Sequence, residues 1–238
     1  MKVLGIVTAR GGSKGIPRKN LALLAGRPLL AYTADAALAS RHINRVVLST
    51  EDLEIAEVGR RLGLDVPFMR PEELARDDTP SLPVLQDVVR RLEAEGESYD
   101  AVFTLQPTSP LRRSDDIDGA IELLEATGAD SVVSFVDIGG HHPARMKYIS
   151  EDGRAIDPPF VEAREGQRRQ ELAKLYLREG SIYVTQMPVL MEQNSIRGKD
   201  CRAWIIPRER ACDIDEPFDL FLAEQLLKSA ALPRAAAA

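Results

Sequence analysis

The sequence predicts one α/β domain with a mostly parallel central sheet, and three observations favour this fold class. Short apolar runs alternate with longer segments whose apolar residues recur at helical spacing. A basic, glycine-rich loop directly follows the first apolar run. The 238 residues, 44% of them hydrophobic, suffice for one large core. Because alternating strands and helices require crossovers that cover both faces of a sheet, we expect a ligand site at the carboxyl ends of the strands.

Each expected element has a local signal. The first strand, 3–9, is a continuous apolar run of the kind found in buried parallel strands. The first helix, 28–40, starts with a proline and is rich in alanine and leucine. The remaining expected elements are a strand at 45–50, a helix at 51–62 ended by Gly63, an extended segment at 64–68, a helix at 81–95, a strand at 101–105, a helix at 114–126 and a strand at 131–136.

The alternation stops at about 139–180, where prolines and a dense run of charges replace it. We expect an inserted arm here, of the kind that makes contacts between subunits. A solvated loop is the alternative, but an unstructured loop of this length is unusual inside a compact domain. We therefore expect 1–238 to form a single domain with one inserted arm, and we assign no function to the alanine tail at 235–238.

Composition argues against several classes of protein. Charged residues make up 29% of the chain with both signs mixed, and the net charge of −6 suggests no broad basic face for nucleic acid. No apolar run is long enough for a membrane span, and the first residues lack the length of a secretion signal. Cys201 and Cys212 have no metal-type spacing and fit reduced thiols. We expect a cytoplasmic protein without a membrane or nucleic-acid partner.

The loop at 9–20 is the strongest functional signal. Its glycines permit close backbone approach to a ligand, its N–H groups form an anion cradle, and its cations suit a triphosphate. The glycines are Gly11, Gly12 and Gly15, and the cations are Arg10, Lys14, Arg18 and Lys19. A P-loop is excluded because Ile16 follows Gly15, and Pro17 argues against a dinucleotide-binding turn that opens into a helix. A basic surface turn is the remaining alternative.

Several further motifs follow this loop in a fixed order. They are Arg10 to Asn20, Arg70 to Ala75 with Asp77 to Thr79, Leu105 to Arg112, His141 to Pro143, Arg168 to Leu172, Gly180 to Val184 and Asp213 to Asp215. Together they resemble the acylneuraminate cytidylyltransferases, also called CMP-sialic acid synthetases. The resemblance implies a Rossmann-like nucleotidyltransferase fold, CTP as substrate, Mg²⁺ as cofactor, and a homodimer in which the arm contacts the partner subunit.

The implied reaction joins CTP to an acidic nonulosonic sugar, N-acetylneuraminate or a relative. The anomeric hydroxyl of the sugar attacks the α-phosphorus of CTP, so that a CMP-sugar forms and pyrophosphate leaves. The residues expected to bind the nucleotide are Arg10, Gly11, Gly12, Ser13, Lys19, Asn20 and Ser81. Of these, Arg10 and Lys19 would bind the triphosphate, and Asn20 and Ser81 the nucleoside. A plain helix N-cap is the alternative for Ser81.

The resemblance also implies a set of residues on the sugar side. Gln106 follows a strand and would lie beside the sugar and the reacting phosphate. Arg169 would pair with the sugar carboxylate from the partner subunit, a role its neighbour Arg168 could also fill. Tyr183 would line the sugar pocket, and Arg145 would contribute more weakly.

Asp213 and Asp215 alternate, so that on an extended segment their carboxylates point the same way. Two carboxylates on one face suit Mg²⁺ that bridges phosphates. A helix N-terminus capped by Asp215 is the alternative, and the two interpretations are compatible. The general base stays open between these aspartates, acting directly or through metal-bound water. The pair His141 and His142 is interpreted as a structural turn rather than as acid–base or metal chemistry.

Three departures from the family pattern fall on the sugar side or the arm. Ile196-Arg197 stand where the family has a Phe-Phe pair, Ala173 replaces a proline, and Glu179 replaces an asparagine. The identity of the sugar therefore stays open, with legionaminic and ketodeoxynonulosonic acid among the alternatives. A nucleotidyltransferase of the same fold with another acceptor or nucleotide is one rival. A non-catalytic nucleotide-binding module is another, but it would not need Asp213 and Asp215.

Overall fold

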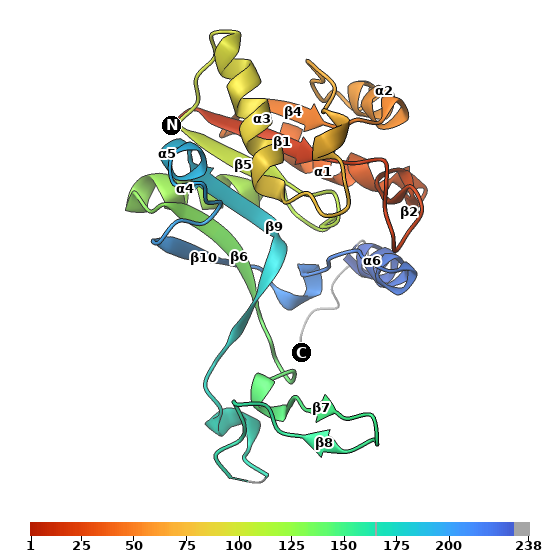
Figure 1. Ribbon diagram of the computed structural model, residues 1–238, viewed down its shortest axis with the longest axis vertical. Helices are drawn as coiled ribbons and strands as arrows, with labels where there is room; N and C mark the ends of the chain where they lie inside the picture. Colours follow the sequence, from red (N-terminus) through yellow and green to blue (C-terminus); the bar gives the residue numbers. More distant parts are fainter. Residues whose placement is uncertain (165, 231–238) are drawn as a thin grey trace, which may run out of the picture.

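A six-stranded mixed sheet forms the centre of the molecule, and its strand order is β10-β6-β9-β5-β1-β4 (Figure 1). The computed structural model describes residues 1–164 and 166–230, so the alanine tail lies outside the described residues. The strands of the sheet are β1 Val3–Thr8, β4 Ile43–Ser49, β5 Ala101–Leu105, β6 Ser131–Asp137, β9 Tyr176–Gln186 and β10 Cys201–Ile205. The helices are α1 Leu29–Leu38, α2 Leu53–Arg61, α3 Ser81–Ala94, α4 Ser114–Thr127, α5 Met187–Met191 and α6 Pro217–Ala230.

The predicted α/β class and the mostly parallel sheet are confirmed. β1 pairs in parallel with β4 and β5, and β10 with β6, whereas β9 runs antiparallel between β5 and β6. Each strand and helix expected before residue 137 is present, with ends shifted by a few residues. The extended segment at 64–68 contributes only one bridge, between Val47 and Asp65. β9, α5, β10 and α6 were not predicted.

The side chains of β1 alternate between the two faces of the sheet, and apolar residues point to both faces. Val3 and Val7 face one side of the sheet and pack in the larger core with α1, α2 and α4. Leu4 and Ile6 face the other side and pack with α3 and α5. Both faces of the strand are therefore buried, which removes the polar alternation of a half-exposed strand.

A third, smaller core joins the two ends of the chain. Ile16 of the glycine loop packs with Leu29 of α1, with Ile214 and with Ala223 of α6. The backbone N–H of Ile214 also donates to the carbonyl of Thr108, in the turn after β5, at 2.8 Å. The glycine loop, the turn after β5 and the segment before α6 are therefore fixed beside one another at the carboxyl edge of the sheet.

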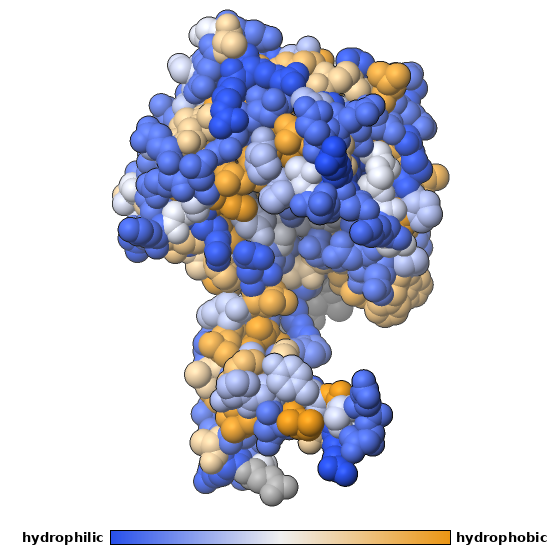
Figure 2. Space-filling view, in the orientation of Figure 1, coloured by the Kyte–Doolittle hydropathy of each residue, from blue (hydrophilic) through white to orange (hydrophobic). Residues whose placement is uncertain are grey.

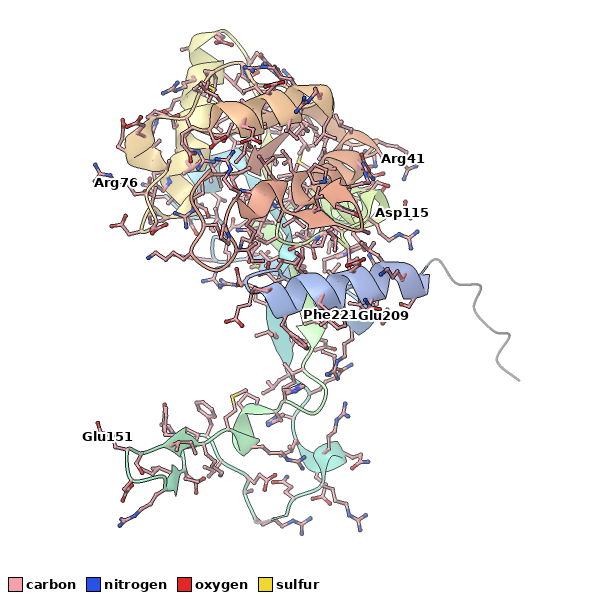
Figure 3. The ribbon with its side chains drawn as sticks, turned by 90° about the vertical axis from the view of Figure 1, so that its right-hand side faces the viewer. Arg41, Arg76, Asp115, Glu151, Glu209 and Phe221 are labelled. Atoms are coloured by element: carbon pink, nitrogen blue, oxygen red, sulfur yellow. The ribbon has the colours of Figure 1, made fainter. Side chains whose placement is uncertain are left out.

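The segment between β6 and β9 projects from the body as an arm (Figure 1). It carries the hairpin of β7, Tyr148–Ile149, and β8, Ala155–Ile156, and two short 3-10 turns. β6 and β9 continue out of the sheet as a two-stranded ribbon that leads into the arm, with Asp137 opposite Tyr176. Glu151, in the turn between β7 and β8, lies far from the body (Figure 3). Among the described helices, none is long and apolar enough to cross a membrane.

Candidate active site

A polar cleft of about 380 Å³ opens at the carboxyl edge of the sheet, where the glycine loop, the turn after β5 and the segment before α6 meet. The predicted residues that line it are Arg10, Gly12, Ser13, Lys19, Asn20, Ser81, Gln106, Asp213 and Asp215. They come from the loop after β1, the start of α3, the turn after β5 and the segment before α6. Residues far apart in the sequence therefore form one site.

Close packing requires glycine at two positions of the loop, Gly11 and Gly15, whereas a Cβ on Gly12 would meet nothing within 4 Å. A Cβ on Gly15 would overlap the backbone carbonyl oxygen of Asp215, so only glycine lets the loop lie against the C-terminal segment. A Cβ on Gly11 would come within 2.5 Å of the Asp52 carboxylate. The N–H of Gly11 donates to Glu51 at 2.6 Å, and Gly11 does not line the cleft.

Acidic side chains of the body pair with the cations of the loop. Arg10 donates to Asp77 at 2.5 Å, and Lys14 lies 3.2 Å from the same carboxylate. Hydrogen bonds from Lys14 and Arg10 hold the pKa of Asp77 below its ordinary value. Arg18 instead pairs with Asp52 beside α2 and does not line the cleft.

Lys19 connects the loop to the C-terminal carboxylates. Its ammonium donates to the carbonyl of Ile214 at 2.8 Å and to the carboxylate of Asp215 at 2.9 Å. The Lys19 side chain is only 15% exposed, whereas that of Asp215 is 75% exposed. Asn20 supports the same loop, because its amide donates to the carbonyl of Arg10 at 2.8 Å.

The interpretations of Asp215 and Ser81 as helix caps are wrong. Asp215 does not cap α6: the carboxylate of Asp219 accepts the N–H groups of Asp215 at 3.0 Å and Glu216 at 2.8 Å. Ser81 makes no capping hydrogen bond at the start of α3, where Pro80 holds the cap position, and it lines the cleft. Neither side chain caps a helix, and both line the cleft.

Asp213 and Asp215 fit a Mg²⁺ ion that shares its coordination with phosphates. Partial burial in the cleft raises the pKa of Asp213, and the charges of Asp215 and Glu179 add to this effect. A divalent cation would relieve that repulsion. No group of three metal-ligating side chains occurs in the described ranges, and Mg²⁺ held by one or two carboxylates with phosphates and water needs none.

Gln106 is presented by a rigid turn. Its carbonyl accepts from the guanidinium of Arg112 at 2.7 Å and from the hydroxyl of Thr33 at 3.3 Å. A Cβ on Gly180 would stand 3.3 Å from both the amide oxygen of Gln106 and a carboxylate oxygen of Asp213. The absence of a side chain on Gly180 therefore lets Gln106 and Asp213 lie close together in the cleft.

Sequence reasoning missed several residues that line the cleft. These are Thr8, Arg70, Leu74, Arg76, Asp77, Thr79, Val84, Pro107 and Thr108. Arg70 is the most notable, since it is buried and donates to the hydroxyl of Ser49 at 3.0 Å and to its carbonyl at 2.6 Å. Burial lowers the pKa of Arg70, and the charge of Glu51 opposes this. The sequence feature that could have indicated these residues is the run of charged residues just before α3, at the expected edge of the site.

The structure does not bring Arg145, Arg169 and Tyr183 into this cleft. Arg145 lies in the arm and is engaged by Glu162 at 2.9 Å. Arg169 lies at a groove in the arm, and Tyr183 lies on β9, where burial raises its pKa. The arm that carries Arg169 stands away from the body (Figure 1), so the expected role of Arg169 toward the sugar stays a prediction.

The two histidines lie in a structural turn, as expected. A ring nitrogen of His142 accepts the N–H of Ala144 at 3.1 Å, and its other ring nitrogen lies 3.1 Å from the carbonyl of Ala173. His142 therefore caps the short 3-10 turn Pro143–Arg145. Both cysteines of the chain are free thiols.

Comparisons with known proteins identify the family of this chain. A family model described as cytidylyltransferase matches residues 4–190. The CMP-N,N'-diacetyllegionaminic acid synthase of Legionella pneumophila is 33% identical over 96% of this chain and 97% of its own length. The pseudaminic acid cytidylyltransferase of Campylobacter jejuni is 34% identical over the same shares. The N-acylneuraminate cytidylyltransferase of Streptococcus agalactiae is 34% identical over 90% of this chain and 51% of its own length.

The fold has relatives among solved structures. A CMP-2-keto-3-deoxy-manno-octonic acid synthetase in complex with CTP superposes with a TM-score of 0.73 over 97% of this chain and all of the other, at 16% identity. The 4-diphosphocytidyl-2C-methyl-D-erythritol synthase of Anaerococcus prevotii gives 0.60 over 95% of this chain and 96% of the other, at 14% identity. These likenesses show a Rossmann-like nucleotidyltransferase fold. Since the family model spans most of the sequence and the relatives nearly all of it, this chain belongs to the cytidylyltransferase family of nucleotidyltransferases.

Proposed function

We propose that this protein transfers CMP from CTP to an acidic nonulosonic sugar and releases pyrophosphate. One observation carries the proposal: a single cleft gathers the glycine-rich cationic loop, Gln106 and the Asp213–Asp215 pair on a member of the cytidylyltransferase family. The relatives at 33–34% identity are named for legionaminic, pseudaminic and neuraminic acids. The shared class is therefore an acidic nine-carbon sugar, and similarity at this level does not select one of them.

The triphosphate binds at the positive side of the cleft. Lys19, Arg10 and Arg70 converge there, and the glycine loop adds backbone N–H donors. Arg10 is paired with Asp77, so a phosphate would compete with that carboxylate for the guanidinium. Ser81 and Asn20 lie in the same cleft for contact with the nucleoside.

Transfer is an in-line displacement at the α-phosphorus. The bond from the anomeric oxygen to phosphorus forms as the bond to the pyrophosphate oxygen breaks, and the cations of the cleft stabilise the charge that moves onto pyrophosphate. Asp213 and Asp215 would hold Mg²⁺, which when bound neutralises phosphate charge. The proton of the sugar hydroxyl passes to one of these two carboxylates, since the amide of Gln106 cannot accept it. Gln106 orients the acceptor beside Asp213.

A homodimer explains the apolar arm. Its exposed apolar side chains are Met146, Tyr148, Ile149, Ile156, Phe160, Val161, Leu175, Tyr176 and Leu177. Figure 2 shows apolar patches at the junction of the arm with the body and on the arm itself, separated by more polar surface. A surface of this kind favours burial against another chain. In that arrangement Arg169 reaches the partner's cleft and pairs with the sugar carboxylate. We also place the reaction in the cytoplasm, because both cysteines are free thiols and thiols stay reduced there.

Pyrophosphate release tests the proposal. CTP, GTP, UTP and ATP are each crossed with a panel of acidic nonulosonic sugars in the presence of Mg²⁺. We expect release only with CTP and one or a few of the acids, and none in Asp213→Ala or Arg10→Ala. Failure to bind CTP would overturn the proposal, and CTP binding without release from any acid would direct the search to another acceptor.

A further inference from the structure

A buried carboxylate next to the cleft has no role in the proposed reaction. Glu179 is 7% exposed, and its oxygen Oε1 has no hydrogen-bond partner in the described part of the chain. Its other oxygen accepts the N–H of Ser181 at 2.9 Å and also the Ser181 hydroxyl. A buried charge with half of its acceptor capacity unused is costly unless the surroundings need it.

Glu179 lies in a bulge of β9. Residues 179–182 stand opposite Ser134 alone, because Tyr183 pairs with Val133 and Arg178 with Phe135. The Ser134 hydroxyl donates to the carbonyl of Glu179 at 2.7 Å and accepts the N–H of Ile182 at 2.9 Å. Bulges of this kind redirect a strand and occur next to active sites. Here the bulge separates the sheet from the ribbon that leads to the arm, and it places Gly180 against Gln106 and Asp213.

A chain of hydrogen bonds runs from this bulge to Gln106. Glu179 holds Ser181, and the carbonyl of Ser181 accepts from the Arg112 guanidinium at 2.5 Å. Arg112 also donates to the carbonyl of Gln106 at 2.7 Å and to the hydroxyl of Thr33 at 3.1 Å. All the members except Gln106 are buried, so the network has few alternative partners.

The network needs a negative charge, and Glu179 is placed to provide it. Arg112 is buried and has no ion pair among the described residues. Burial lowers the pKa of Arg112 to about 10, and the charges of Glu179, Asp116 and Asp213 oppose this effect. Asp116 is already paired with Arg210, and Asp213 faces the cleft. Glu179 is therefore the buried carboxylate left to balance Arg112.

We propose that Glu179 is a positioning residue: its carboxylate fixes the bulge of β9 and, through Ser181 and Arg112, holds Gln106 at the cleft. The catalytic consequence of this inference rests on the proposed function, since Gln106 matters to the rate only if it orients the acceptor. The structural consequence does not, because the turn after β5 is fixed by the network whatever the substrate. The two consequences are therefore tested separately.

Amide hydrogen exchange tests the structural consequence in the full-length protein. The reporters are Ser109 and Arg112, whose N–H groups donate within the turn at 3.4 Å each. In Glu179→Ala we expect their exchange to accelerate by about tenfold, because the acceptor that orders Ser181 is lost. Exchange in β4 should stay unchanged. Glu209→Ala is the matched control, since Glu209 is an exposed carboxylate on the neighbouring segment (Figure 3).

Kinetics with CTP and the accepted acid test the catalytic consequence. We expect Glu179→Ala to lower kcat by about 100-fold through misplacement of Gln106, with the KM for CTP changed by less than about twofold. Glu179→Gln keeps an oxygen for Ser181, and we expect it to recover kcat to within about tenfold of the natural enzyme. If Glu179→Ala does not fold, Ser181→Ala removes only the hydroxyl and should shift exchange and kcat in the same directions.

The outcomes separate the two proposals. If the natural protein turns over no acid, the proposed function fails, and the exchange measurement alone decides the role of Glu179. Faster exchange confined to residues 178–182, or equal exchange in Glu179→Ala and Glu209→Ala, overturns the inference. A loss of kcat without faster exchange at Ser109 and Arg112 overturns it as well, because Glu179 would then act on the reaction without positioning the turn.

Discussion

The ammonium of Lys19 donates to the carboxylate of Asp215 at 2.9 Å and so joins the glycine loop to the segment before α6. The two residues lie at opposite ends of the sequence, yet they line one cleft. Under the proposed function, this contact would connect nucleotide binding with transfer, because the triphosphate would lie beside the Mg²⁺ that Asp213 and Asp215 would hold.

Lys19→Met tests that connection, because methionine keeps an apolar side chain of similar length without the charge. We expect kcat/KM for CTP to fall roughly 10- to 100-fold, the range for loss of a charged hydrogen bond. Lys14→Met is the comparison, since the Lys14 side chain is 79% exposed and pairs with Asp77. In Lys14→Met, kcat/KM for CTP should fall by less than about fivefold. Equal losses in both variants would mean that general positive charge, and not the position of Lys19, matters.

Gly15→Ala should disrupt the nucleotide site through the backbone. The added methyl would overlap the carbonyl of Asp215, so the loop or the C-terminal segment must move. We expect kcat/KM for CTP to fall by about 100-fold while far-ultraviolet circular dichroism shows a folded protein. Gly140→Ala is the control, because a methyl there meets nothing within 4 Å. Full activity in Gly15→Ala would show that this close approach is not needed.

Asp77→Asn should strengthen CTP binding. Asp77 pairs with Arg10 and Lys14, so a bound triphosphate would compete with its carboxylate. Calorimetry should give a Kd for CTP about two- to fivefold lower in the variant, with the gain shrinking at high salt. Asp78→Asn provides the neighbouring control. Weaker binding in Asp77→Asn would instead show that Asp77 contributes directly to the bound state.

Asp118 gives a pH-dependent contribution to stability. Burial raises its pKa, but hydrogen bonds from Ser40 at 2.6 Å and Arg41 at 3.0 Å outweigh this, and the net pKa lies below its ordinary value. A carboxylate with a lowered pKa in the folded state stabilises above its unfolded pKa, about 4, and loses that contribution as the pH falls through the folded value.

We therefore expect Asp118→Asn to lower the free energy of unfolding by about 1–3 kcal/mol at pH 7. The difference between variant and natural protein should shrink below about pH 4. Urea unfolding across this pH range measures it. Asp115→Asn, at an exposed residue 3.6 Å from Arg113, should show little change at any pH. If the difference in unfolding free energy for Asp118→Asn does not depend on pH, Asp118 does not stabilise the fold as an ionised, hydrogen-bonded carboxylate.

The first two-thirds of the fold were predictable because each buried strand is built mainly of apolar residues. β9 was not, because its first residues, Tyr176 and Leu177, are exposed in the ribbon and its centre is a bulge with Glu179 and Gly180. β10 is an edge strand with mostly exposed or half-buried positions, so it too lacks an apolar pattern. Local periodicity does not encode elements whose burial depends on the rest of the sheet.

Much of the cleft was predictable because its glycines, cations and carboxylates stand in recognisable motifs. Arg70 and Arg112 stand in those motifs too, but their function depends on which carbonyls they meet after folding. The pairing of Arg10 with Asp77 likewise joins loops that only the fold brings together. The expected roles of Arg145, Arg169 and Tyr183 remain predictions, since they concern the sugar and a second subunit.

Oxygen-labelled substrate tests the central claim most directly. Each acidic sugar is prepared with ¹⁸O at the anomeric hydroxyl and incubated with CTP, Mg²⁺ and the protein, and the products are analysed by mass spectrometry. We expect one acid to give a CMP adduct that keeps the label, with an equal amount of pyrophosphate, because the anomeric oxygen attacks the α-phosphorus. No CMP adduct with any acid, or an adduct that lacks the label, would contradict the proposed transfer.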